Sequence, residues 1–212
     1  MLELSAIRLA TRERVLVRDL NASVGAGEVL AVMGESGSGK SSLLAYLCGT
    51  LADGLHAQGR VRLGGRDITT LPVAERRVGI LFQDDLLFPH MNVLDNLLFA
   101  LPAGLRAGRV ARAQAALAEA GLAGSGPHWP HTLSGGQRAR VSVLRAMLAQ
   151  PQALLLDEPF SRLDAALRAR FRAFVFAGIR QQGIPAVLVT HDPQDVPAGA
   201  QIIHLNAEPD RA

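Results

Sequence analysis

The sequence of 212 residues lacks several features that mark particular classes of protein. It has a single cysteine, Cys48, which excludes an internal disulfide and favours a reducing compartment. Apolar runs such as residues 29–33, 97–101 and 153–156 fall far short of the roughly 20 residues that a membrane-spanning helix needs. Residues 1–11 lack the basic, apolar and small-residue order of a signal peptide. We therefore expect a cytoplasmic protein that does not cross the membrane.

Lysine is almost absent, because Lys40 is the only lysine among the 22 basic residues. The formal net charge of +3 would suit a nucleic-acid partner, but the arginines are spread along the chain without a dense basic run. We interpret them as ordinary solvated faces and expect no nucleic acid. A compact ammonium on a thin stem differs from a guanidinium wherever the group must enter a tight loop. Position 40 is therefore expected to need lysine specifically.

The apolar pattern predicts an α/β fold. Hydrophobic residues make up 49% of the chain and charged residues 19%, which suits one globular domain and excludes bulk disorder. Residues 2–9 and 15–24 alternate in part and are predicted to form an antiparallel β edge. Further strands are expected at residues 28–33, 60–63, 78–82, 153–156, 186–190 and 202–205, and helices at 40–51 and 165–182. Such alternation predicts a mostly parallel sheet with active residues at the carboxyl ends of its strands.

The middle of the chain has a different texture. It contains no convincing strand, and proline and glycine breaks separate three expected helices, at residues 93–101, 110–120 and 135–149. We therefore predict a single domain over residues 1–212. In it, a helical subdomain at about 84–150 interrupts a core made of residues 1–83 and about 151–212.

A glycine-rich loop follows the strand expected at residues 28–33 and precedes a helix. It matches the phosphate-binding loop pattern with Gly34, Glu35, Ser36, Gly37, Ser38, Gly39, Lys40 and Ser41. Glycines let backbone N–H groups turn toward phosphate oxygens, and the helix N-terminus adds positive potential. We expect Lys40 to reach the outer phosphates and Ser41 to ligate Mg²⁺, and we include Ser42 among the nucleotide-binding residues. The alternative, a flexible Gly/Ser turn, leaves the only lysine unexplained.

Two adjacent acids, Asp157 and Glu158, end the apolar strand expected at residues 153–156. A carboxylate at a strand end beside a phosphate loop can hold the Mg²⁺ shell, so we predict Asp157 as a metal ligand. Glu158 points differently and can polarise a water that attacks the γ-phosphate. A surface acid pair is the alternative, and the phosphate loop disfavours it.

A second glycine-containing turn precedes the helix expected at residues 135–149. Ser134 can cap this helix, while Gly135 and Gly136 expose backbone N–H groups at its positively polarised end. With Gln137 they form a candidate second anion site. Alone, such a turn is more often only a helix cap.

In this order, the motifs resemble the ATPase subunits of ABC transporters. The resemblance rests on the phosphate loop, Gln83, residues 133–137, residues 154–158, the run Ser161, Arg162, Leu163 and Asp164, and His191. It implies a P-loop, RecA-like core that binds ATP and Mg²⁺. It also implies a head-to-tail homodimer, in which residues 133–137 of one subunit close over ATP held by the phosphate loop of the other.

The resemblance also implies roles for individual residues. Gln83 would contact Mg²⁺ and the attacking water, and so would link the core to the helical insert. His191 would be a switch residue that contacts the γ-phosphate. Asp164 would communicate across the dimer, although Arg162 stands where small residues are more usual in the family.

The turn at residues 11–14 departs from the family pattern. Family members commonly stack an aromatic residue on adenine here, and this turn contains none. Arg12 or Arg14 could stack on the base through its guanidinium plane instead. The use of GTP therefore stays open.

Residues 79–93 are similar to importer ATPases of the sulfate, molybdate, polyamine and thiamine kinds. In that group this segment helps to form a groove for a cytoplasmic permease helix, so Leu86, Leu87 and Phe88 are expected to be an exposed docking surface. Core packing of the insert is the alternative. The implied function is ATP hydrolysis that drives a membrane permease, peripherally bound at the cytoplasmic face of the inner membrane and supplied by a solute-binding protein. The C-terminal regulatory domain of many such ATPases is expected to be missing.

Other functions explain less of the sequence. A non-transport ABC ATPase acting on nucleic acid or the ribosome is the main alternative, but such relatives have long coiled-coil insertions or two fused cassettes. A small P-loop kinase leaves residues 133–137 and the two acids unexplained. A scaffold without turnover conflicts with the presence of Glu158, Gln83 and His191.

Overall fold

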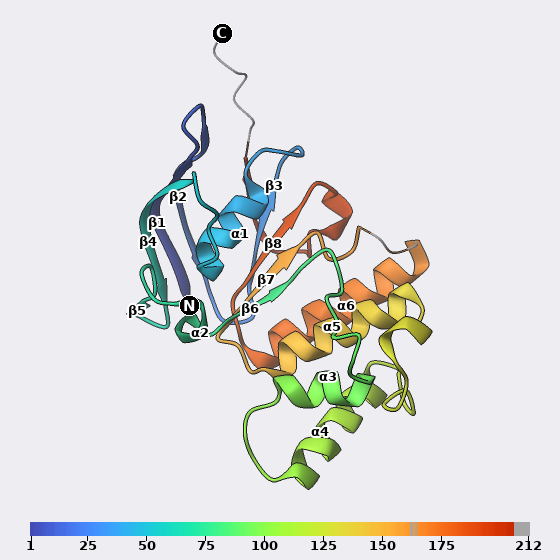
Figure 1. Ribbon diagram of the computed structural model, residues 1–212. Helices are drawn as coiled ribbons and strands as arrows, with labels where there is room; N and C mark the ends of the chain where they lie inside the picture. The colour runs from blue at the N-terminus through green and yellow to red at the C-terminus, as the bar shows by residue number, and fades with distance from the viewer. Residues whose placement is uncertain (162, 164, 206–212) are drawn as a thin grey trace. The chain divides into compact units, whose positions relative to one another are not determined.

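The computed structural model describes residues 1–161, 163 and 165–205 (Figure 1), so Arg162 and Asp164 lie outside the described residues. The chain divides into two compact units. The first comprises Met1–Ile80, Gln152–Glu158 and the described chain from Ile179 onward, and the second comprises Leu81–Pro151 and Pro159–Gly178. Within the described ranges, no helix has both the length and the apolar character needed to cross a membrane.

The first unit contains a four-stranded antiparallel sheet with the order β2-β1-β4-β5. Its strands are β1 (Leu2–Ala10), β2 (Val15–Val24), β4 (His56–Leu63) and β5 (Arg66–Asp67). Alternate residues of β1 are buried, as expected for a sheet with one covered face. A register shift interrupts β1 near Ala6, whose φ is 50° and whose N–H donates to Asn21 Oδ1 at 2.8 Å.

A five-stranded sheet with the order β6-β7-β8-β3-β9 forms the rest of the first unit's β structure. Its strands are β3 (Val29–Met33), β6 (Val78–Leu81), β7 (Ala153–Asp157), β8 (Ala186–Thr190) and β9 (Gln201–His204). β3 pairs in parallel with β8 and β9, and β7 pairs in parallel with β8. Every residue of β3 and β8 is buried, which is typical of central parallel strands.

One apolar core holds both sheets and helix α1 (Lys40–Cys48) together. The helix lies between glycines in left-handed backbone conformation, Gly39 with φ 98° and Gly49 with φ 90°. Arg76, in the short helix α2 (Val73–Arg76), is buried, and its Nη1 donates to the Tyr46 carbonyl at 2.8 Å and to the Leu47 carbonyl at 3.1 Å. These bonds satisfy carbonyls in the last turn of α1.

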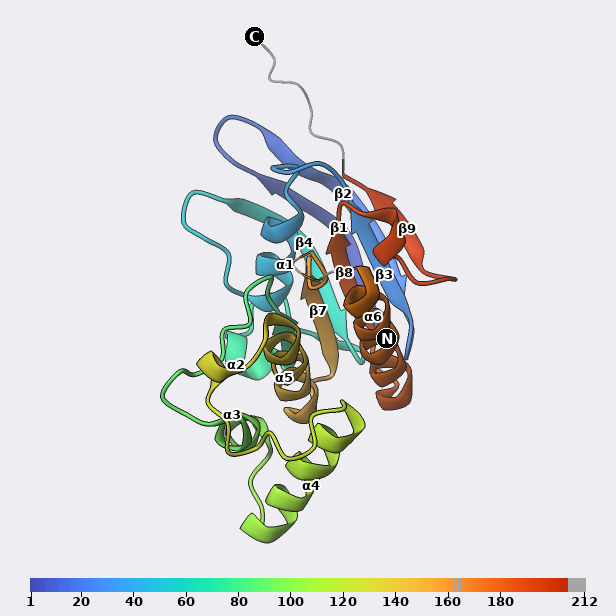
Figure 2. The same ribbon diagram turned by 90° about the vertical axis from the view of Figure 1, so that its right-hand side faces the viewer.

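The second unit consists mainly of helices, which are labelled in Figure 2. They are α3 (Val93–Ala100), α4 (Arg106–Glu119), α5 (Gly135–Leu148) and the larger part of α6 (Ala165–Gln182). Their core contains Val93, Leu97, Leu117, Val141 and Leu144.

The expected return to the core at about residue 151 differs from the observed division, because Pro159–Gly178 groups with the second unit. The Phe160 and Phe171 rings make an edge contact there at 5.8 Å. Gly178 of α6 also lies so close to Met147 of α5 that a Cβ would stand 2.6 Å from the Met147 methyl group. The backbone of α6 therefore packs against a side chain of α5 within one unit.

Candidate nucleotide-binding and hydrolysis site

At two positions of the loop between β3 and α1, only glycine fits. A Cβ on Gly34 would lie 2.4 Å from the Leu205 carbonyl oxygen and 2.7 Å from Ser38 Oγ. Gly39 has a φ of 98°, and a Cβ there would lie 2.8 Å from the Leu16 Cβ. This local packing excludes side chains at these two positions, as an anion site made of backbone N–H groups requires.

Lys40 turns its ammonium back into this loop. Its side chain is 6% exposed, and Nζ donates to the Gly34 and Glu35 carbonyls at 2.8 Å each. Nζ also lies 4.0 Å from Glu158 Oε1. The only lysine of the chain therefore places a nearly buried point charge between the loop and a carboxylate, a position that suits binding of outer phosphates.

The Ser38 hydroxyl is buried and has no hydrogen-bond partner among the described residues. A buried orphan hydroxyl is uncommon in proteins and calls for a specific reason. Here it lies in the phosphate loop, where a phosphate oxygen would satisfy it. The loop thus fits a bound nucleotide, and Ser38 is one of the residues for which the sequence predicts nucleotide binding.

Ser41 and Asp157 meet at the end of β7, where Ser41 Oγ donates to Asp157 Oδ1 at 3.3 Å. Burial raises the pKa of Asp157, and the charge of Glu158 raises it further, whereas the Ser41 bond and Lys40 lower it. Cations therefore stabilise the ionised carboxylate. The described residues contain no cluster of three or more His, Cys, Asp or Glu side chains that could hold a metal. One carboxylate and one hydroxyl fit Mg²⁺, which takes few protein ligands beside phosphate and water.

Glu158 follows β7 in a strained backbone conformation, with φ 44°. Its N–H donates to the Val189 carbonyl at 3.1 Å, which fixes it beside β8. Glu158 Oε2 lies 3.1 Å from Nδ1 of His191, whose side chain is 60% exposed. The first unit therefore brings Lys40, Asp157, Glu158 and His191 to one edge of its parallel sheet, where active residues gather in such folds.

The turn between β1 and β2 lies against the phosphate loop. Thr11 Oγ1 accepts hydrogen bonds from the N–H groups of Glu13 and Arg14, at 3.2 Å and 3.1 Å. Arg14 Nη2 donates to the Gly37 carbonyl at 3.3 Å. The turn lines an open hollow that contains no aromatic side chain among the described residues. Of the two arginines proposed to stack on the base, Arg14 is the one that contacts the phosphate loop.

In the second unit, Ser134 caps α5, as its sequence position predicted. Its Oγ accepts from the Gln137 N–H at 3.3 Å, and Gln137 Oε1 accepts from the Ser134 N–H at 2.8 Å, forming a capping box. Gly136 lies against Leu167, where a Cβ would stand 2.0 Å from a side-chain methyl. A nucleotide contact by Ser134, Gly135, Gly136 and Gln137 stays a prediction.

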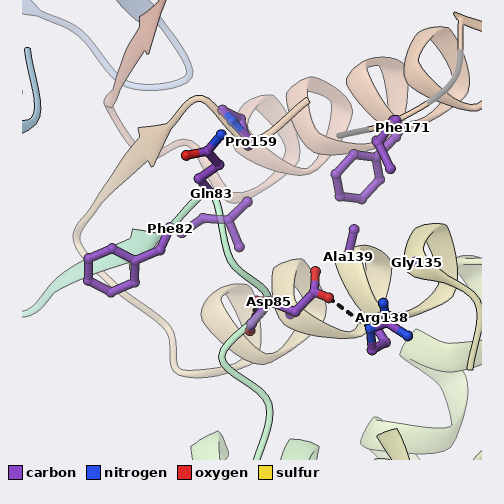
Figure 3. A pocket seen from close by; sticks show the side chains of 11 residues that line it. Phe82, Gln83, Asp85, Gly135, Arg138, Ala139, Pro159 and Phe171 are labelled. Atoms are coloured by element: carbon purple, nitrogen blue, oxygen red, sulfur yellow. Dashed lines mark hydrogen bonds and ion pairs between the residues drawn. The ribbon is translucent and has the colours of Figure 1, made fainter. Parts of the chain in front are cut away.

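Gln83 is exposed and belongs to the second unit, where its Nε2 donates to Ser161 Oγ at 3.3 Å. It lines a cavity of about 170 Å³ together with Asp85, Gly135, Arg138 and others (Figure 3). Ser41 and Asp157 belong to the first unit, so a metal site shared with Gln83 stays a prediction.

The expected docking surface of Leu86, Leu87 and Phe88 needs correction. Leu86 is 55% exposed, but Leu87 is half-buried and packs against the helical core. Phe88 is also half-buried, because its ring meets Phe99 at 4.9 Å. Phe99 itself is 65% exposed and was missed, although a phenylalanine outside the buried stripe of α3 is a recognisable signal.

A phosphate-binding loop between a parallel strand and a helix, with an acid pair at the end of a strand in the same sheet, defines a P-loop NTPase. The chain belongs to the ABC transporter family, whose model matches residues 17–161. It is therefore an ATP-binding subunit with the fold of the ATPases that are coupled to transport.

Similar proteins agree with this family. An uncharacterized ABC transporter ATP-binding protein YnjD of Escherichia coli is 49% identical over 97% of this chain and 95% of its own length. The thiamine import ATP-binding protein ThiQ of Cereibacter sphaeroides is 44% identical over 89% of this chain and 81% of its own. The Fe(3+) ions import ATP-binding protein FbpC 1 of Rhizobium meliloti is 43% identical over 84% of this chain, which spans 50% of that relative.

A solved structure shares the fold over nearly the whole chain. It is a dimeric post-hydrolysis state of the ATP-binding cassette MJ0796 bound to ADP and Pi, with a TM-score of 0.81 and 28% identity. The match covers 99% of this chain and 97% of that one.

Proposed function

We propose that this ATPase subunit drives a solute importer by hydrolysing ATP at the edge of the first unit's parallel sheet. The observation that carries the proposal is the grouping of Lys40, Asp157, Glu158 and His191 around the phosphate loop. Import is supported by the thiamine and Fe(3+) import relatives, and by the similarity of residues 79–93 to importer ATPases.

Each residue of the group has a task in hydrolysis. Lys40 holds the outer phosphates of ATP, helped by the bare backbone of the loop and the Ser38 hydroxyl. Ser41 and Asp157, with Gln83 as a further proposed ligand, would hold Mg²⁺, which would supply positive charge that offsets the charge on the phosphate oxygens. Glu158 orients the attacking water and accepts its proton, and ADP and phosphate are the products.

His191 is placed to control the catalytic carboxylate. Because its Nδ1 lies 3.1 Å from Glu158 Oε2, the ring can hold that carboxylate in one orientation while its other nitrogen, Nε2, contacts the γ-phosphate. The strained φ of Glu158 indicates that its position is set by the surroundings rather than by local preference.

The working form is a head-to-tail homodimer, a proposal supported by the dimeric state of the solved neighbour. In it, Ser134–Gln137 of one protomer completes the site formed by the phosphate loop of the other. The capped N-terminus of α5 offers N–H groups and positive potential, which suit a phosphate. Closure on ATP and opening after hydrolysis would then move the transporter between its two states.

The remaining partners are a membrane permease and its solute-binding protein. The permease would contact the exposed Leu86 and Phe99, and would hold the subunit peripherally at the cytoplasmic face of the plasma membrane. The transported solute never touches this subunit, so the permease and its solute-binding protein must determine which solute is imported.

Phosphate release by the purified protein with ATP and Mg²⁺ tests the proposal directly. Lys40→Ala should abolish tight ATP binding in a titration, whereas Arg60→Ala is the matched control. Arg60 is an exposed cation of the same unit, and its Nε pairs with Asp67 at 3.2 Å, so it should bind ATP like the wild type. Unchanged ATP affinity in Lys40→Ala would overturn the assignment of the loop.

A further inference from the structure

Asp85, Leu86, Leu87 and Phe88, here called the 85–88 segment, are held along one face of helix α5. Arg138 Nε donates to the Asp85 carboxylate at 3.0 Å, a contact drawn in Figure 3. One turn further along the same face, the buried Ser142 hydroxyl donates to the Asp85 carbonyl at 2.8 Å. The spacing of four residues places both donors on the same side of the helix.

Arg145, three residues beyond Ser142, completes this row of donors. Its Nη1 donates to the Leu86 carbonyl at 2.8 Å, and its guanidinium carbon lies 5.2 Å from the centre of the Phe88 ring. Burial lowers the pKa of this guanidinium, and no carboxylate pairs with it in the described part of the chain. The fully buried Asn96 binds the other end of the segment, accepting from the Phe88 N–H at 2.9 Å.

Leu86 is exposed on the surface, and its backbone has an unfavourable conformation. Its φ is 46°, a left-handed conformation that is unfavourable for a leucine and persists only where its surroundings enforce it. The Arg145 bond to its carbonyl supplies that constraint. A large apolar side chain held out in this way is typical of a contact surface rather than of a core.

The same row of donors reaches the N-terminal end of α5. Arg138 Nη1 donates to the Leu133 carbonyl at 2.8 Å, immediately before the N-cap Ser134. A helix of 14 residues transmits displacement as a stiff rod, so the backbone of Leu86 and the start of α5 are joined through hydrogen bonds on one helix face.

We propose that Arg145 is a positioning residue that couples the Leu86 surface to the Ser134–Gln137 end of α5. A permease helix that displaces Leu86 then shifts the end of α5 that faces the second protomer's nucleotide. This inference rests on the proposed function and deepens it, because it names the side chain through which the docking surface acts on hydrolysis.

The first test is amide hydrogen exchange on the purified full chain, which needs neither turnover nor a partner. Arg145→Ala should speed exchange about tenfold in two places, because local opening becomes easier when the Arg145 hydrogen bond to the Leu86 carbonyl is lost. These are Leu86, Leu87 and Phe88, and at the start of α5 Gly136 and Gln137. Arg109→Ala is the matched control. Arg109 also donates to carbonyls, those of Leu98 and Leu101, but it makes no contact with the 85–88 segment.

The second test is steady-state ATP hydrolysis. Arg145→Ala should lower kcat about tenfold with KM changed less than about twofold, because displaced catalytic groups slow the reaction without removing the phosphate loop. Arg145→Lys keeps the charge and one donor, and should recover part of kcat. Arg109→Ala should retain wild-type kcat.

Two results would overturn the coupling role. One is faster exchange confined to the 85–88 segment with the α5 end unchanged, and the other is equal loss of kcat in Arg145→Ala and Arg109→Ala. If the wild type bound and hydrolysed no ATP, the proposed function would fail, whereas the exchange result would still decide whether Arg145 links the two regions.

Discussion

Burial raises the pKa of Asp157 above the ordinary value of a carboxylate. Because its pKa is raised, the folded chain binds the carboxyl proton more tightly than the unfolded chain does. The contribution of Asp157 to stability is therefore full below the ordinary carboxyl range and is lost as the pH rises through the raised pKa. In a chain without nucleotide, the ionised residue is a source of instability at neutral pH.

Asp157→Asn should accordingly raise Tm at neutral pH in the absence of Mg²⁺, and the difference should vanish as the pH falls below about 4. Thermal unfolding at several pH values measures this. Asp67→Asn is a control of opposite sign, because hydrogen bonds from Thr69 lower the pKa of Asp67 and its removal should destabilise the chain at neutral pH. A lower Tm for Asp157→Asn at pH 7 would contradict the burial argument. The same variant should lose Mg²⁺-dependent hydrolysis.

Glu158 is the residue proposed to orient the attacking water and to accept its proton. Glu158→Gln keeps the size of the side chain but cannot accept a proton, so ATP hydrolysis should fall by roughly 10²-fold or more while ATP still binds. Phosphate release and equilibrium titration measure the two properties separately. Turnover at the wild-type rate would show that another group activates the water.

At the scale of secondary-structure elements, Arg76 joins helix α2 to the end of α1. Besides the Tyr46 and Leu47 carbonyls, it donates to the Leu71 carbonyl at 2.8 Å and to the Thr69 carbonyl at 2.7 Å. Arg76→Met fills similar space but removes the donor to these carbonyls, of which the Tyr46 carbonyl keeps the Gly49 N–H at 3.2 Å, and this should cost about 3 kcal/mol. Urea unfolding measures the loss. Arg66→Met removes only an exposed ion pair with Glu75 and should change stability by less than about 0.5 kcal/mol.

The elements with strong apolar periodicity were predictable from the sequence. The strand at residues 15–24 and the helix at 165–182 have the predicted bounds, and those of the helix beginning at Val93 differ by one residue. Helix α4 begins four residues earlier than expected, because its first turn contains no large apolar residue and so carries no apolar signal. The short β5 and α2 were missed, since two and four residues show no period.

The candidate site was predictable only where its residues are adjacent in the chain. Gly34 to Ser41 and the pair Asp157 and Glu158 are local motifs, whereas the contact between Glu158 and His191 joins residues 33 positions apart. The burial of Phe88 likewise depends on Phe99 and Arg145, which no local pattern connects to it.

At the scale of the whole molecule, the proposed homodimer gives a prediction about mass. Glu158→Gln cannot reset by hydrolysis, so ATP and Mg²⁺ should hold it closed as a dimer of twice the chain mass of 22.5 kDa. Light scattering after size exclusion measures this. Lys40→Ala under the same conditions should remain monomeric, and a monomeric Glu158→Gln at saturating ATP would contradict ATP-driven closure.

The strand that leads into the phosphate loop has both of its sheet neighbours far away in sequence. β3 is completed by residue 33, but β8 and β9 are not made until residues 186–190 and 201–204. The Leu205 carbonyl that crowds Gly34 comes later still. In a nascent chain, the strand that leads into the loop gains both of its neighbours, and Gly34 its contact with Leu205, only after more than 200 residues have been synthesised. Earlier folding of the first unit must therefore proceed without nucleotide bound to the completed site.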